Sequence, residues 1–228
     1  MESIKHINFA ERLSKQQMII GLFLVFTQCT KLWGLVHETW IIIGEIIIVA
    51  IFFSRTLLES IKSVLKKIKK TLLWTKIGFI VIFLLQNVVW DAIIKQIFIQ
   101  MFMIEKIANS NQSNLTSMLL EYPILMSLLV VVIGPILEEI IYRFALFRTL
   151  YEKNHFLAYF ITAFVFGLQH IFSATIMNGQ MGESINIIGY MIFGFGLSFV
   201  YVKTKNLTAS ILIHILNNLI GVAIVMNW

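Results

Sequence analysis

Residues 122–150 read YPILMSLLVVVIGPILEEIIYRFALFRTL, an apolar stretch long enough to cross a membrane that carries two adjacent carboxylates, Glu138 and Glu139. A charged side chain near the centre of a bilayer costs about 2.5–3.5 kcal/mol on insertion scales. Two such side chains in succession therefore indicate a function inside the membrane. Two histidines, His170 and His214, lie in later apolar segments and could belong to the same site.

The composition extends this interpretation to the whole chain. Of its 228 residues, 58% are hydrophobic and 13% are charged, whereas soluble domains are nearer 45–50% apolar and about 25% charged. Only 2 prolines and 12 glycines occur, so helices are seldom interrupted. We predict an all-α fold, a polytopic membrane bundle of about seven transmembrane helices, with six to eight allowed and no soluble domain.

Seven apolar segments predict the positions of these helices. The expected spans are about 17–35, 38–54, 72–103, 119–149, 156–174, 184–202 and 207–227. We divide the chain into N-terminal membrane helices, residues 1–118, and a catalytic core of four helices, residues 119–228. Glu45, in the second span, is interpreted as a buried, hydrogen-bonded side chain rather than a catalytic one.

The charges predict an orientation in the membrane. The net charge is +6, and with a cytoplasmic N-terminus every basic residue except Lys31, Lys95 and Lys106 falls on the inner side. The positive-inside rule then places the N-terminus in the cytoplasm and the C-terminus outside. The basic run KSVLKKIKK, residues 62–70, is expected on the inner membrane surface against anionic lipid, and no nucleic-acid partner is expected.

The segment EEIIYR assigns different roles to its two glutamates. Glu139 and Arg143 are four residues apart, so they share a helical face and are expected to form a buried ion pair that braces the bundle. Glu138 points about 100° away and stays available as a base or ligand. Gly134-Pro135, one turn earlier, can kink the helix and open space beside Glu138.

Two further motifs, FGLQH ending at His170 and HILNN beginning at His214, supply other polar groups. A lone histidine in an apolar helix is more often a satisfied core residue than a ligand, so His170 by itself leaves both interpretations open. His214 and Asn218 share a helical face and could donate two hydrogen bonds to one forming oxyanion. At 1.5 Å per residue, all these groups could meet in one cavity below the cytoplasmic face.

Two chemistries fit these residues. A carboxylate and a histidine can hold and deprotonate a water molecule. Alternatively, Glu138, His170 and His214 could bind a zinc ion and leave its fourth position for water. Either arrangement presents a nucleophilic water to a peptide carbonyl. No serine has a sequence cue as a nucleophile, nor has the single cysteine, Cys29.

The motifs EExxxR, FxxxH and HxxxN, each in a separate apolar helix, resemble the CPBP family of intramembrane proteases, also called the CAAX protease and bacteriocin-processing, or Abi, family. The resemblance covers residues 119–227. It implies that Glu138 and His170 activate water, that His214 and Asn218 stabilise the oxyanion, and that Glu139 and Arg143 support them. Family members have been described both as metalloproteases and as metal-independent glutamate proteases, so the resemblance leaves the metal open.

The expected function is therefore an intramembrane endopeptidase that cuts a membrane-associated peptide or protein near the cytoplasmic side, with lipids and that substrate as its partners. The short chain resembles bacterial members, which are linked to peptide maturation and bacteriocin self-immunity, more than eukaryotic enzymes that cut prenylated C-termini. An alternative is a non-catalytic membrane immunity protein that binds a bacteriocin or its receptor. A transporter is disfavoured because no inverted repeat of broken helices is visible.

Overall fold

The computed structural model describes residues 9–30, 38–103 and 107–227, and this part of the chain is helical without any strand. The prediction of an all-α membrane bundle is confirmed. Six of the described helices are long and apolar enough to cross a membrane. They are Trp40–Lys66, Ile68–Met101, Pro123–Tyr151, His155–Met177, Met181–Thr204 and Leu207–Met226.

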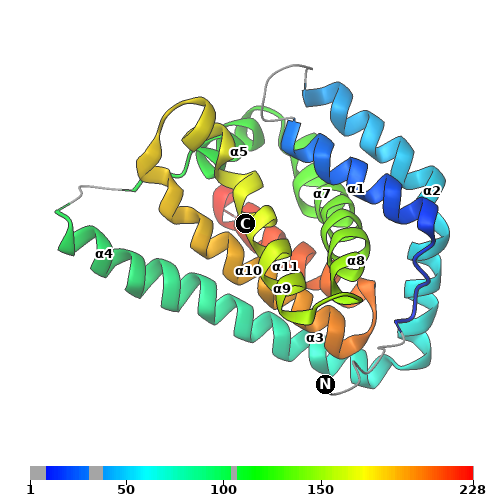
Figure 1. The fold of residues 1–228 in the computed structure, drawn as a ribbon. Coiled ribbons are helices and arrows are strands. Elements are labelled where there is room, and N and C mark those ends of the chain that lie inside the picture. Colours follow the sequence, from blue (N-terminus) through cyan, green and yellow to red (C-terminus); the bar gives the residue numbers. More distant parts are fainter. Residues whose placement is uncertain (1–8, 31–37, 104–106, 228) are drawn as a thin grey trace.

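The first two helices differ from the predicted spans in length (Figure 1). Helix α1 (Lys15–Thr30) has 16 residues, and residues 31–37, where the expected first span ended, lie outside the described residues. Helix α2 (Glu38–Lys66) runs well past the predicted end at residue 54. Lys67 then turns the chain, and α3 (Ile68–Phe83) begins. The basic run thus comprises the end of α2, the turn at Lys67 and the start of α3.

The third span continues from α3 through the π-helix η2 (Leu84–Ile94) into α4 (Lys95–Met101). Helix α5 (Ser110–Glu121) is a separate element, capped by the Asn109 side chain, which accepts a hydrogen bond from the Gln112 amide. It ends at Tyr122 because a residue before proline is disfavoured in the helical conformation. The fourth span therefore begins at Pro123 rather than at residue 119.

The helix that carries the two glutamates alternates between α and π geometry. Its consecutive parts are α6 (Pro123–Leu128), η3 (Leu129–Ile133), α7 (Gly134–Glu138), η4 (Glu139–Phe147) and α8 (Arg148–Tyr151). Gly134 donates its amide to the carbonyl of Leu129, five residues back. The next donor in that pattern would be Pro135, which has no N–H, so the Val130 carbonyl is left without a helical partner. The helix continues through Gly134-Pro135 but contains this defect.

The last helices are α9 (His155–Phe172), which continues as η5 (Ser173–Met177), η6 (Met181–Asn186), α10 (Ile187–Thr204) and α11 (Leu207–Met226). Gly167 brings α9 close to α10, since a Cβ atom there would lie 3.0 Å from the Ile187 carbonyl oxygen and 3.1 Å from Met191 Cγ. This approach holds His170, one turn further along α9, against α10.

The two ends of the bundle differ in content. The α8–α9 and α10–α11 turns and the corner between α2 and α3 lie at one end, whereas α5 and the η5–η6 connection lie at the other (Figure 1). Many large apolar side chains point outward, among them Ile124, 87% exposed, and Phe156, 76% exposed. Such a surface fits the lipid environment that the composition predicts.

Candidate active site

Glu139 and Arg143 form the predicted ion pair. Arg143 Nη1 lies 2.9 Å from Glu139 Oε1, and both side chains are 0% exposed. Arg143 Nη2 also donates to the Gly194 carbonyl at 3.1 Å, and the guanidinium lies 4.6 Å from the centre of the Phe166 ring. The arginine is therefore held by partners from three helices, and it balances the Glu139 charge inside the bundle.

Glu138 is the accessible carboxylate, as its offset along the helix predicts. Its side chain is 19% exposed, and its Oε2 atom lies 3.7 Å from His214 Nε2. This oxygen accepts no hydrogen bond within the described residues. An acceptor without a partner at a cavity wall can bind water, a proton or a cation.

His170 is held in one tautomer by its own helix. Its Nδ1 atom lies 2.8 Å from the Phe166 carbonyl oxygen. Because a carbonyl can only accept, Nδ1 carries the proton, and the lone pair of Nε2 is available as a base or ligand. The ring stacks on Tyr190, with 4.3 Å between centroids, and the Tyr190 hydroxyl accepts from Asn111 at 3.2 Å. These contacts fix the ring plane.

His214 joins the ion pair to the cavity. Its Nδ1 lies 3.0 Å from Glu139 Oε1 and donates to that carboxylate, so Nε2 is turned toward Glu138. The side chain is only 4% exposed. Glu139 thus contacts Arg143 on one side and orients His214 on the other, which is a positioning role.

Asn218 supplies a hydrogen-bond donor at the defect in the helix that carries the two glutamates. Its Nδ2 donates to the Val130 carbonyl at 2.9 Å, the carbonyl left free because Pro135 cannot donate. A backbone group at membrane depth needs such a partner. An amide nitrogen carries two hydrogens, so the second one is available to a ligand. Asn217 donates to Asn218 Oδ1 at 3.4 Å and further restrains the amide.

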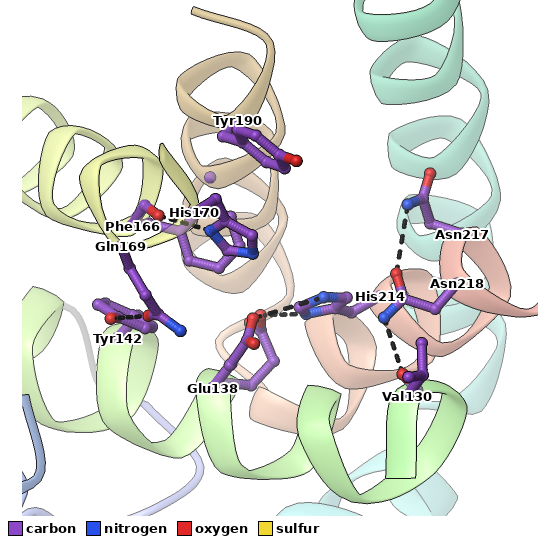
Figure 2. A network of polar contacts seen from close by, with 12 residues as sticks. Val130, Glu138, Tyr142, Phe166, Gln169, His170, Tyr190, His214, Asn217 and Asn218 are labelled. Carbon is purple, nitrogen blue, oxygen red and sulfur yellow. Dashed lines mark hydrogen bonds and ion pairs between the residues drawn. The ribbon is translucent and has the colours of Figure 1, made fainter. Parts of the chain in front are cut away.

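One cavity of about 430 Å³ brings Glu138, His170, His214 and Asn218 together. Figure 2 shows the two imidazoles and the Glu138 carboxylate pointing toward a common space. Within the described residues, no three His, Cys, Asp or Glu side chains are grouped so as to hold a metal ion. Glu138, His170 and His214, the three candidate zinc ligands, nevertheless all line this cavity.

The first two helices also contribute to the cavity, which the sequence did not predict. Gln28 of α1 lines it, accepts from Gln169 Nε2 at 3.0 Å and donates to Glu45 Oε2 at 2.7 Å. Gln169 in turn accepts from the Tyr142 hydroxyl. Glu45 is 2% exposed, so its interpretation as buried and hydrogen-bonded is confirmed. In the sequence, the only sign of this part of the cavity is that polar residues occur within apolar spans.

The fold and the site define a class of protein: a polytopic membrane protein whose carboxylate and imidazoles surround an internal cavity. Residues 120–220 match the family model described as type II CAAX prenyl endopeptidase Rce1-like. This part of the chain is therefore similar to the Rce1-like family of CAAX-type membrane proteases, as the order of the motifs predicts. All four residues at the cavity, together with Glu139 and Arg143, lie inside the matched range.

Bacterial proteins are among the relatives. The chain is 35% identical over 88 residues, 38% of this chain and 32% of the relative, to "Putative membrane peptidase YdiL" of Bacillus subtilis. It is 30% identical over 195 residues, 81% and 54% of the two chains, to an uncharacterised protein of Mycoplasma capricolum. It is 33% identical over 141 residues, 57% and 59%, to UPF0177 protein YaiF of Lactococcus lactis. The matches thus span about a third to three-fifths of these relatives. No solved structure matches the chain.

Proposed function

We propose that this protein is an intramembrane endopeptidase in which Glu138 and His170 activate a water molecule for attack on a peptide carbonyl. The observation that carries the proposal is the contrast between the two adjacent glutamates. Glu139 is buried and paired with Arg143, whereas Glu138 Oε2 accepts no hydrogen bond from the described residues, lies 3.7 Å from His214 Nε2 and belongs to a side chain that lines a cavity together with His170 and His214.

In the first step, a water molecule lies between Glu138 and His170. The free Nε2 lone pair of His170 accepts one hydrogen bond from it, and the Glu138 carboxylate accepts the other. The water oxygen attacks the carbonyl carbon while its proton passes to Glu138. The π bond of the carbonyl opens, and its electron pair becomes an oxyanion.

In the second step, the oxyanion is stabilised by His214 and Asn218. A His214 ring protonated on both nitrogens donates Nδ1–H to Glu139 and presents Nε2–H to the cavity, and Asn218 offers its second amide hydrogen. When the intermediate collapses, the C–N bond breaks and Glu138 returns its proton to the leaving nitrogen. The products are an amine and a carboxylic acid, and the acid passes its remaining proton to the Glu138 carboxylate as it leaves as a carboxylate.

Zinc is a second way to activate the same water. It would need Glu138, His170 and His214 to draw together around the ion, with water in the fourth position. Since the described side chains are not grouped in this way, the steps above use no metal, and zinc binding is left to the experiment below.

We also propose a biological setting and an orientation. The substrate is a membrane-associated peptide or small protein in a bacterial cell membrane, cut during peptide maturation or bacteriocin self-immunity. The names of the bacterial relatives, one of them a membrane peptidase, support a bacterial protease. The excess of lysines at one end of the bundle supports a cytoplasmic N-terminus.

The test compares purified wild-type protein with Glu138→Gln, a change that keeps the shape and removes the base. Both are incubated in detergent micelles with a panel of apolar peptides, with and without a strong chelator. We expect Glu138→Gln to lower kcat by about 10²–10⁴-fold, the usual contribution of a general base. Wild-type cleavage that persists with chelator supports the metal-free steps, whereas loss that zinc reverses supports the metal.

The same variant separates the protease from the binding protein. An immunity protein that only occludes a bacteriocin would protect cells equally well with Gln at position 138. Protection by Glu138→Gln at the wild-type level, combined with no cleavage by either protein, would refute the proposed function in favour of binding.

A further inference from the structure

We propose that a groove between α3 and α9, on the lipid-facing surface of the bundle, binds an acyl chain of an anionic phospholipid whose phosphate group pairs with Lys203. The groove has a volume of about 530 Å³ and shares no lining residue with the cavity that Glu138 lines. The inference therefore stands apart from the proposed function, and either can fail without the other.

Helix α10 forms the floor of the groove, because α3 and α9 both pack against it (Figure 1). Glycines bring both helices close to α10. A Cβ atom at Gly196 would lie 2.4 Å from Ile82 Cγ1 of α3. On the other side, a Cβ atom at Gly194 would lie 3.4 Å from Ala163 Cα of α9. Larger side chains of α3 and α9 then form the two walls of a channel along α10.

The groove is apolar and open to the surroundings of the bundle. Its lining residues are glycines and residues with aliphatic, aromatic or thioether side chains. Ile77, Phe160 and Phe195, one from each of the three helices, are exposed. In a bundle that spans a membrane, such a surface contacts hydrocarbon. An empty indentation would lose the dispersion contacts of its lining atoms, so we infer that a lipid acyl chain fills it.

The length of the groove matches one leaflet of a bilayer. Along α10 the lining residues extend from Ile188 to Phe199, a distance of about 17 Å at 1.5 Å per residue. Along the third span they extend over the same number of residues, from Trp74 to Leu85. The hydrocarbon core is about 30 Å thick, so the chains of one leaflet span about 15 Å. The groove therefore accommodates one extended acyl chain from the headgroup region to the bilayer midplane.

Lys203 lies at the end of the groove where the headgroup is expected. Its Nζ atom is 5.4 Å from the centre of the Trp74 ring and 5.3 Å from the centre of the Phe199 ring, and both rings line the groove. Trp74 is near the start of α3, and Lys203 is in the last turn of α10. Tryptophan and lysine are typical of this position, because their polar ends reach the headgroup level from an apolar stem or ring.

The charge of Lys203 is available to a ligand. Among the described residues it forms no ion pair with Asp or Glu, and its side chain is exposed. An ammonium group has three donors and no acceptor. Beside an apolar groove it favours a ligand that joins an anion to a hydrocarbon chain, which is the chemistry of a phospholipid. A zwitterionic headgroup carries its own cation next to the phosphate, so an anionic lipid gains more from Lys203.

Native mass spectrometry of the purified protein tests the headgroup. The protein in detergent is titrated with phosphatidylglycerol or with phosphatidylcholine of the same acyl chains, and the dissociation constant of the first bound lipid is measured. We expect phosphatidylglycerol to bind about fivefold more tightly, on the scale of one lysine beside an anionic lipid. Lys203→Gln should abolish this preference and Lys203→Arg should retain it. Lys62→Gln, at an exposed position of α2 outside the groove, is the matched control and should behave like wild type.

Equal binding of the two lipids by wild type would overturn the proposal, as would a preference that persists in Lys203→Gln. Glycerol phosphate, which has the anion without the chain, is added as a competitor and should not displace the lipid. Displacement by glycerol phosphate would assign Lys203 to a free phosphate. A dimer that carries no lipid would assign the groove to a second copy of the chain, and either result would refute the lipid site.

A second pair of variants tests the groove itself. Ile77→Trp adds bulk inside the groove, whereas Ile80→Trp makes the same change at an exposed position of α3 outside it. Since added bulk displaces the acyl chain, we expect Ile77→Trp to weaken the binding of both lipids about tenfold, and Ile80→Trp to leave it unchanged. Equal lipid binding by these two variants would refute the proposed site.

Discussion

Glu139→Gln should lower the free energy of unfolding, because it leaves the buried Arg143 charge without its partner. The substitution keeps the size of the side chain but removes the charge that lies 2.9 Å from Arg143 Nη1, in a pair whose side chains are 0% exposed. Breaking a buried pair by removing one partner costs about 3–5 kcal/mol, because the other charge stays buried without compensation. That corresponds to a roughly hundred- to several-thousand-fold shift in the unfolding equilibrium.

The assay is unfolding of the purified protein in mixed micelles with increasing SDS, followed by circular dichroism. Glu59→Gln is the matched control, since Arg55 Nε and Glu59 Oε1 also pair at 3.0 Å with i,i+4 spacing, but with side chains 89% and 38% exposed. An exposed helical pair contributes about 0.3–0.5 kcal/mol, so this control should unfold almost like wild type.

A double variant completes the test. Glu139→Gln with Arg143→Met removes both charges, and we expect it to be more stable than Glu139→Gln alone, because no buried charge is left unpaired. The reasoning would be refuted if Glu139→Gln cost no more than Glu59→Gln, or if the double variant were no more stable than the single one.

Three further changes test other parts of the structure. Pro135→Ala restores a backbone N–H that competes with Asn218 for the Val130 carbonyl. We therefore expect a stable protein whose kcat is reduced about tenfold, on the scale of one hydrogen bond. An unchanged kcat would contradict this. Gln28→Leu leaves the Gln169 amide without its partner and should cost about 1–3 kcal/mol in the same SDS assay; wild-type stability would argue against that contact. Burial raises the pKa of the Glu11 carboxyl from its ordinary value of 4.5, against the lowering effect of the hydrogen bond from the Leu207 amide. Because the pKa of Glu11 is higher in the folded than in the unfolded protein, folding favours the protonated carboxyl. The contribution of Glu11 to the free energy of unfolding is therefore fully present below pH 4.5 and is lost as the pH rises through the folded pKa. Wild type should therefore lose thermal stability relative to Glu11→Gln over that rise, and parallel curves of Tm against pH would refute it.

Several features of the site could be predicted from local spacing. The Glu139–Arg143 pair follows from helical periodicity, because residues four apart share a face whatever surrounds them. The availability of Glu138 follows from the same periodicity, since its neighbour must point elsewhere. The membrane class follows from composition, because lipid is the only solvent in which so apolar a surface is stable.

Helix boundaries were predicted less well. In residues 38–70 the sequence does not show where the helix ends, because lysines are compatible both with a continuing helix and with a loop. The structure continues α2 to Lys66. The start of the fourth span was placed too early because the apolar run begins before Pro123, although the backbone breaks at Tyr122.

By itself, the sequence determined the all-helical membrane class, the similarity of residues 120–220 to the Rce1-like family and the different surroundings of Glu138 and Glu139, since each depends on composition or on neighbours along one helix. Only the tertiary structure showed that Gln28 of α1 reaches the cavity and that Asn218 donates a hydrogen bond to the Val130 carbonyl, which has no partner in its own helix. These features are contacts between residues 88 to 141 positions apart, and such contacts depend on how helices tilt and pack, which periodicity within one helix does not encode.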